Sequence, residues 1–210
     1  MQLSNSELVF DHIAVVARSL EEGASYIGEK LGIEMPPGGS HPIMGTHNLL
    51  LSLGSDCFLE VIAIDPKSAA PNRSRWFGLD GFDAEPRIGA WILGAGDIRS
   101  SLDGMQETAG PIIEMTRSDL TWLMSVREDG AVPLSGAFPK VLQWPEGPHV
   151  ASKMGQRGCS FASLTVESPN ADDINTWLDG KLDDPRIKIG YGETRLTAVI
   201  ETPSGPKVLC

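Results

Sequence analysis

The feature of this sequence that most restricts its fold is an order of elements, strand, helix and then further strands, that begins three times. Each copy opens on a run rich in β-branched residues, continues into an amphipathic segment, and closes on apolar runs separated by turn residues. This repetition predicts an α+β fold with a curved, mostly antiparallel sheet and helices on its convex face. The predicted strands are 9–16, 47–53, 57–64, 88–93, 112–116, 121–126, 160–166, 196–201 and 207–209, and the predicted helices are 19–31, 97–109 and 170–182.

The first copy carries the clearest local signals. Ser19 and Glu22 form a capping box, in which each side chain can satisfy a free backbone N–H at the start of a helix. Gly32 supplies the expected stop of that helix. A stretch dense in Pro and Gly follows, which is either a loop or a short strand, before the predicted hairpin begins at residue 47.

Composition excludes several classes of partner. The 210 residues, enough for one large domain or two small ones, carry 17 Lys and Arg against 28 Asp and Glu, a net charge of −11 at pH 7. Such an excess of negative charge repels a phosphate backbone and an anionic membrane surface, so nucleic-acid binding and membrane docking are disfavoured. The three cysteines show no CxxC spacing, which favours a reducing compartment. Because the N-terminus lacks the pattern of a signal peptide, we expect a cytoplasmic protein.

Two polar residues lie within strongly apolar predicted strands. Strand alternation places His12 on one face with Phe10 and Ala14, whereas Glu60 shares a face with Phe58 and Ile62. A buried carboxylate needs a cation, a donor or water, and an imidazole and a carboxylate on inward faces of one sheet can share a divalent ion. A satisfied core histidine and a solvent-facing edge glutamate would explain the same residues.

Further candidates lie near the second predicted strand and in a later loop. His47 could be a third metal ligand, could orient a bound anion together with Asn48, or could be a loop histidine without a role. Arg75 and Trp76 could contact an anionic or aromatic ligand, although a solvated basic loop beside core aromatics explains them equally. His41 and His149 are weaker candidates, both in predicted loops.

These residues resemble the glyoxalase-like domain of the vicinal oxygen chelate superfamily. The resemblance covers residues 8–66 closely and 87–209 by pattern only. It implies paired βαβββ modules, each curled into half of an open barrel around a metal whose ligands come from the first and last strands of a module. His12 and Glu60 match those two positions in the first module. The segments that carry the resemblance are 10–16, the capped helix ending Lys30-Leu31-Gly32, the run Gly45-Thr46-His47-Asn48-Leu49, and 58–62.

The resemblance also implies how the chain is divided. We expect one compact unit with a first module at 8–66 and a second half at 87–209, which contains a crossing loop at 133–158. Aligning the predicted helices places Ala90 and Ser163 of the later copies against His12. Leu209 falls near the place of the superfamily's last glutamate. The second half is therefore expected to lack both of its ligands.

From these residues we expect a small-molecule enzyme of lyase or isomerase type, acting on a carbonyl or vicinal-oxygen substrate, with His12 and Glu60 as candidate catalytic residues. A divalent metal (Zn, Mn, Ni or Fe) on His12, Glu60 and His47 would polarise the carbonyl. We expect this metal to be weakly held or absent, because its ligands come from one half. Two alternatives stay open, a non-catalytic protein that sequesters a small molecule such as an antibiotic, and an Fe(II) dioxygenase. The expected partner is a small-molecule substrate or ligand, and a homodimer is compatible with this interpretation.

Overall fold

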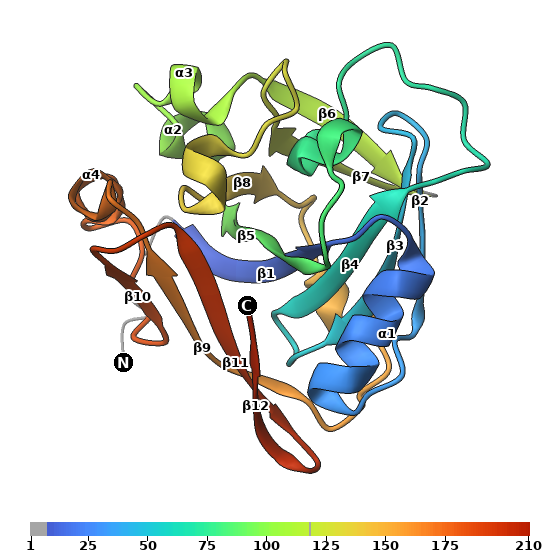
Figure 1. The fold of residues 1–210 in the computed structure, drawn as a ribbon. Helices are drawn as coiled ribbons and strands as arrows, with labels where there is room; N and C mark the ends of the chain where they lie inside the picture. The colour runs from blue at the N-terminus through green and yellow to red at the C-terminus, as the bar shows by residue number, and fades with distance from the viewer. Residues whose placement is uncertain (1–7, 118) are drawn as a thin grey trace.

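The computed structural model, which describes residues 8–117 and 119–210, contains two β-sheets (Figure 1). The strands of the larger sheet are β1 (Leu8–Val16), β2 (Pro37–His41), β3 (Thr46–Ser52), β4 (Phe58–Ile64), β5 (Arg87–Ala95), β6 (Ile112–Arg117), β7 (Leu120–Ser125) and β8 (Lys140–Gln143). The smaller sheet contains β9 (Ser160–Glu167), β10 (Ile187–Gly190), β11 (Arg195–Thr202) and β12 (Gly205–Leu209). The helices are α1 (Leu20–Leu31), α2 (Ile98–Ser101), α3 (Gln106–Ala109) and α4 (Ala171–Leu178), with 3-10 turns η1 (Trp76–Gly81), η2 (Pro133–Gly136) and η3 (Val150–Lys153).

The larger sheet is built from two βαβββ units. Its strand order is β2-β3-β4-β1-β5-β8-β7-β6, so each unit pairs its first strand in parallel with its last, and the units meet through the antiparallel pair β1–β5. The sheet curls until its two edges approach each other, with Gly39 of β2 against the side chain of Arg117 of β6. The prediction of a curved, mostly antiparallel open barrel made of βαβββ modules is confirmed.

The pairing of β1 with β5 relates the two units by an approximate twofold axis. His12 lies opposite Ile92 and Ala14 lies opposite Ala90. A twofold axis that exchanges His12 with Ala90, and Ala14 with Ile92, carries the first of these pairs onto the second. The structure therefore agrees with the helix alignment that matched Ala90 to His12.

Helix α1 begins and ends as its sequence predicts. The Ser19 hydroxyl accepts a hydrogen bond from the backbone N–H of Glu22 at 3.2 Å, and Gly32 closes the helix at φ 71°. The predicted helix 97–109 is instead two short helices, because Gly104 between them takes a φ of 76°. The predicted helix 170–182 stops at Leu178, just before Gly180 at φ 70°.

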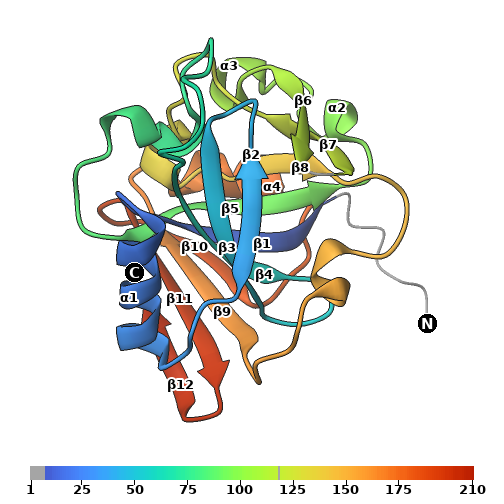
Figure 2. The same cartoon turned by 90° about the vertical axis from the view of Figure 1, so that its right-hand side faces the viewer.

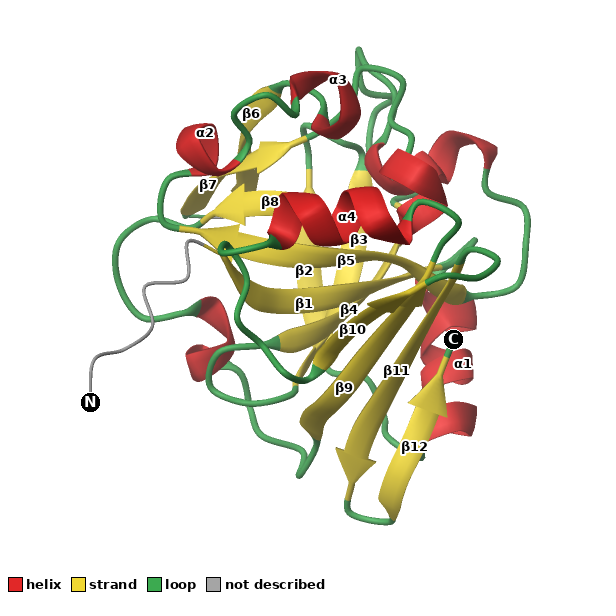
Figure 3. Cartoon of the chain, turned by 90° about the vertical axis from the view of Figure 1, so that its left-hand side faces the viewer, coloured by secondary structure: helices red, strands yellow, loops and turns green. Residues whose placement is uncertain are grey.

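The third copy has the predicted order of elements but a different topology. Its sheet runs β10-β9-β11-β12, with β9 and β10 parallel. This sheet and α4 together pack against the convex face of the barrel (Figure 3). Phe10 of β1 and Phe161 of β9 stack across this junction with ring centroids 4.0 Å apart. After β12, the carbonyl of Cys210 accepts a hydrogen bond from the hydroxyl of Tyr26 on α1 at 2.7 Å. Figure 2 accordingly shows the C-terminus beside α1.

The barrel separates an outer core from an inner core. The outer core lies between the convex face, the helices and the smaller sheet, and includes Ile27, Trp91 and Leu164. The inner core fills much of the concave side, where the connector between the two units contributes Trp76, Phe77 and Leu79 of η1 beside strands β5 and β7. Within the described residues, no helix combines the length and the apolar character needed to span a membrane.

Candidate functional site

A β-bulge at Asp11 determines which side chains of β1 reach the concave face. Phe10 pairs with Leu93 and His12 with Ile92, so Asp11 is an extra residue in the ladder. The bulge turns Phe10 into the outer core, while His12 faces the concave side. The expectation that Phe10 shares a face with His12 is therefore wrong, because simple alternation does not cross a bulge.

His12 lies between two carboxylates at the wall of the concave side. Its Nδ1–H donates to Asp11 Oδ1 at 2.5 Å, and its Nε2 lies 3.6 Å from Glu60 Oε2. The imidazole stacks on the ring of Phe58, and only 5% of the residue is exposed. Burial lowers the pKa of His12, but its contacts with Asp11 and Glu60 outweigh burial and raise it to about 9. His12 is thus an imidazolium at neutral pH.

Glu60 is held as a carboxylate by its neighbours. Asn48 of β3 donates through Nδ2 to Glu60 Oε1 at 2.6 Å, and the Asn48 Oδ1 accepts from the backbone N–H of Gly39 at 2.8 Å, which fixes the amide orientation. Burial raises the pKa of Glu60, but the neighbouring imidazolium of His12, with help from the hydrogen bond of Asn48, brings it below its ordinary value. The structure thus brings together His12, Glu60 and Asn48, all three singled out from the sequence.

Asp11 organises the far side of the imidazole. Its Oδ2 accepts from the indole Nε1 of Trp144 at 2.6 Å and contacts Nε2 of His149 at 2.9 Å. Burial raises the pKa of Asp11, but its contacts with His12 and His149 outweigh this and lower it. Sequence reasoning missed Asp11 and Trp144 and ranked His149 as weak. An acidic residue beside a strand histidine was the signal that could have found Asp11.

His41, rather than His47, faces the concave side. His41 ends β2, its Nδ1 lies 3.1 Å from the Thr46 hydroxyl, and its ring meets the edge of Trp76 at a centroid distance of 5.0 Å. The same hydroxyl accepts from Trp76 Nε1 at 3.1 Å. Burial lowers the pKa of His41 to about 4, so this imidazole is neutral at pH 7.

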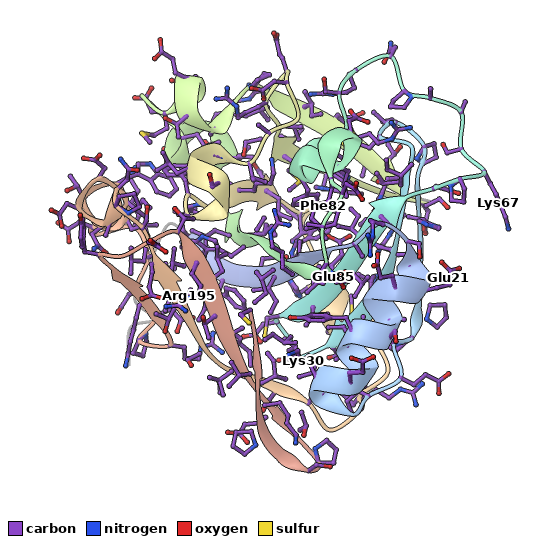
Figure 4. All side chains as sticks on the ribbon, in the orientation of Figure 1. Glu21, Lys30, Lys67, Phe82, Glu85 and Arg195 are labelled. Atoms are coloured by element: carbon purple, nitrogen blue, oxygen red, sulfur yellow. The ribbon has the colours of Figure 1, made fainter. Side chains whose placement is uncertain are left out.

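His47 lies on the opposite face of β3. It follows Thr46 and precedes Asn48, both of which face inward, so alternation turns it outward toward α1. There the pKa of Glu21 is lowered mainly by hydrogen bonds from its own backbone and from Ser19, with His47 the smallest of the causes. Figure 4 shows Glu21 on the outer side of that helix. The structure therefore does not bring His47 together with His12 and Glu60.

The polar cluster opens on a small, partly open and largely aromatic cavity of about 30 Å³. That volume has room for water only, whereas the surface groove that continues from it, at about 490 Å³, is large enough for a small organic molecule. Trp76 lines the cavity as anticipated, whereas Arg75 does not and pairs with Asp80 at 2.6 Å. Arg117 lines both the cavity and a wider surface groove, which also contains Leu50. The aromatic lining residues are Phe58, Trp76, Phe77, Trp122 and Trp144.

The donor set of the site does not complete a metal centre. Across residues 8–117 and 119–210, no group of three His, Cys, Asp or Glu side chains is arranged to hold a metal ion. The two donors that face each other are His12 Nε2 and Glu60, and His12 must lose its proton before it can ligate. The predicted set of His12, Glu60 and His47 is not assembled.

An open barrel of two βαβββ units, with a polar cluster from the first and last strands of one unit on its concave face, is the fold of the vicinal oxygen chelate superfamily. Within that superfamily the chain belongs to the glyoxalase-like domain family, whose model matches residues 10–182. No curated protein matches the sequence.

Solved structures resemble the fold at low sequence identity. A hypothetical protein from Staphylococcus aureus is 19% identical, with a TM-score of 0.57 over 93% of this chain and 82% of that chain. Methylmalonyl-CoA epimerase from Mycobacterium tuberculosis is 15% identical, with a TM-score of 0.44 over 72% of this chain and 97% of that chain. A hypothetical protein from Bacillus halodurans C-125 is 13% identical, with a TM-score of 0.41 over 67% of this chain and 96% of that chain.

Proposed function

We propose that this protein is an isomerase or lyase that moves a proton at the carbon next to a carbonyl group, in a small and largely apolar substrate. One observation carries the proposal: a carboxylate, Glu60, and an imidazolium, His12, lie side by side at the wall of a largely aromatic cavity. Perturbed acid–base pairs in apolar cavities are typical of proton-transfer sites.

The pair supplies both functions that such a reaction needs. Glu60 accepts the proton as the C–H bond breaks, and the electron pair moves onto the carbonyl oxygen as an enolate. His12 Nε2–H donates a hydrogen bond to that oxygen where negative charge develops. Return of the proton to another face or carbon gives an isomer, and expulsion of a leaving group from the neighbouring carbon gives a lyase product. No step passes through a metal ion.

Substrate binding also raises the basicity of Glu60. In the free protein the Nε2–H of His12 is directed at Glu60, with Nε2 3.6 Å from Glu60 Oε2, longer than an ordinary hydrogen bond. A carbonyl oxygen that takes this proton's hydrogen bond leaves Glu60 with the donor Asn48 alone, in an apolar cavity. Loss of a donor and exclusion of water both raise the pKa of a carboxyl, which favours proton abstraction.

A second candidate function is non-catalytic sequestration of an aromatic ligand. The observation that favours it is the lining of the cavity, which includes three tryptophans and two phenylalanines, since aromatic walls bind flat ligands by stacking. In this case the His12–Glu60 pair would hold the ligand's polar group without exchanging its protons.

Deuterium exchange distinguishes the two functions. The protein is incubated in D₂O with a panel of small ketones, 2-oxo acids and acyl thioesters, and loss of each α-proton is followed by ¹H NMR. We expect exchange of one substrate class by the wild type, and a loss of at least about 100-fold in Glu60→Gln, the usual contribution of a general base. Glu21→Gln, the same substitution at an exposed position on α1, is the matched control and should retain the wild-type rate.

Three outcomes contradict the proposal in different ways. Exchange that survives in Glu60→Gln assigns the base elsewhere. Saturable binding without exchange, for every compound on the panel, supports the sequestering protein. Exchange that disappears after chelator treatment and returns with Zn²⁺, Mn²⁺, Ni²⁺ or Fe²⁺ shows that a metal takes part.

A further inference from the structure

Lys140 occupies the place in the second unit that Glu60 occupies in the first. Glu60 of β4 pairs with Ala14, and Lys140 of β8 pairs with Ile92. Ala14 and Ile92 are equivalent under the twofold axis that relates the two units. The prediction that placed this position near Leu209 is wrong, because Leu209 belongs to the smaller sheet and the equivalent position lies in β8.

The ammonium of Lys140 is buried without a hydrogen-bond partner among the described residues. Lys140 is 1% exposed, and its Nζ lies 5.4 Å from the ring centroid of Phe77, which also lines the aromatic cavity. A buried charge without a counter-ion costs several kcal/mol in proteins generally, and one aromatic face offsets only part of it. A negative charge beside Lys140 would offset this cost.

The surroundings of Lys140 add positive charge rather than negative charge. The Nε of Arg73 is also buried without a partner among these residues, while its Nη2 donates to the carbonyl of Arg127 at 3.3 Å. Arg127 forms a two-pronged ion pair with Asp129, at 3.0 and 2.9 Å. Burial, and then the charges of Arg127 and Arg73, lower the pKa of Lys140 to about 8. The charges that act on Lys140 are thus two arginines and one carboxylate, Asp129, which is already paired with Arg127.

We propose that the second half of the barrel binds a small oxyanion, a phosphate or a carboxylate, between Lys140 Nζ and Arg73 Nε. Both groups carry an unfilled N–H donor and a positive charge, which oxyanions accept in charge-assisted hydrogen bonds. Arg127, whose carbonyl accepts from Arg73, has a third of its side chain exposed and lines surface hollows beside α3, so the cluster reaches the surface through this residue. Phe77 lines the aromatic cavity, but neither Lys140 nor Arg73 does, so this anion site is distinct from the proton-transfer site and does not depend on the proposed function.

Ligand-dependent stability tests the site in the full chain. The melting temperature is measured in a zwitterionic buffer with rising sodium phosphate or sodium acetate, against sodium chloride at matched ionic strength. For wild type we expect a rise of about 5–10 °C with one of the two oxyanions at about 100 times its Kd. Lys140→Met should lose this rise, and without oxyanion it should melt no lower than wild type, because the substitution removes an unneutralised buried charge. Lys188→Met, which removes an exposed lysine from β10, is the matched control and should respond as wild type does.

Calorimetric titration gives a second measurement. Arg73→Gln should weaken the affinity for the same oxyanion by about 10-fold or more, the usual contribution of a charge-assisted hydrogen bond. If Lys140→Met does not fold, this variant tests the site instead. Phosphate binding alone points to a phosphorylated or inorganic ligand, and acetate binding to a carboxylate ligand; either supports the site. A wild-type response no larger than that to chloride, or an unchanged response in Lys140→Met, overturns the proposal.

Discussion

Replacing His12 by Gln should change how the stability of the protein depends on pH. The folded-state pKa of His12 is about 9, against 6.5 for an unperturbed histidine. For a group whose pKa is raised by folding, the stabilisation is fully present below pH 6.5 and is lost as the pH rises through about 9. Between these limits the folded state retains a proton that the unfolded state has released.

The size of the effect follows from the same two values. A pKa that rises from 6.5 to about 9 corresponds to about 3 kcal/mol of stabilisation from the imidazolium. Lys140 acts in the opposite direction, because its pKa falls on folding to about 8 and its penalty disappears as the pH rises toward 10.5. The quantity to follow is therefore the difference in unfolding free energy between wild type and His12→Gln, in which the contribution of Lys140 cancels.

Urea unfolding of both proteins at intervals from pH 6 to pH 10 gives this difference. We expect the advantage of wild type to shrink by about 3 kcal/mol across the range, with the loss spread between the two pKa values, from 6.5 to about 9. Proton titration of the imidazole, by NMR with labelled histidine, reads the same pKa directly. A difference that stays constant to within about 0.5 kcal/mol, together with an imidazole pKa below 7, would refute the ion-pair reasoning and leave His12 free to ligate a metal.

Three further changes test other parts of the structure. Asp11→Asn should lower the pKa of His12 and cost about 3 kcal/mol in urea unfolding, because a buried charge pair loses one member; a cost below about 1 kcal/mol would contradict this. Phe10→Ala should cost about 3–5 kcal/mol in the same assay, since it removes the ring that stacks on Phe161 between the two sheets, and an unchanged midpoint would show that the junction contributes little. His47→Gln should leave deuterium exchange unchanged, because His47 lies on the outer face of β3; loss of exchange would return it to the site.

Local signals in the sequence were sufficient for the first unit. The capping box at Ser19 and the stop at Gly32 depend on neighbouring residues only, and helix α1 has the predicted extent. The hairpin of β3 and β4 follows from apolar runs around a short turn, within one residue of the predicted bounds. The position of Glu60 on the concave face follows from alternation along β4, which is regular.

The errors arose where the structure depends on pairing between distant segments. The bulge at Asp11 exists only in the ladder between β1 and β5, and it turned Phe10 to the other face of the sheet. Strand β2 consists of Pro-Gly-Gly-Ser-His, whose propensity favours a loop, and only its pairing with β3 brings His41 inward. Lys140 lies in a four-residue strand within the expected crossing loop, too short to show a period.

Lys140 in the second unit stands where Glu60 stands in the first, and this difference affects whether the barrel can bind a cation between its halves. A cation held there by four equivalent positions would meet His12 and Glu60 from the first unit, but the methyl group of Ala90 and the ammonium of Lys140 from the second. The ammonium repels such a cation, and the inner core contributed by η1 fills much of the second unit's concavity. Proton transfer needs a base and a hydrogen-bond donor from one unit only. The first unit supplies both, and a second unit that carries positive charge takes an anion more readily than a metal.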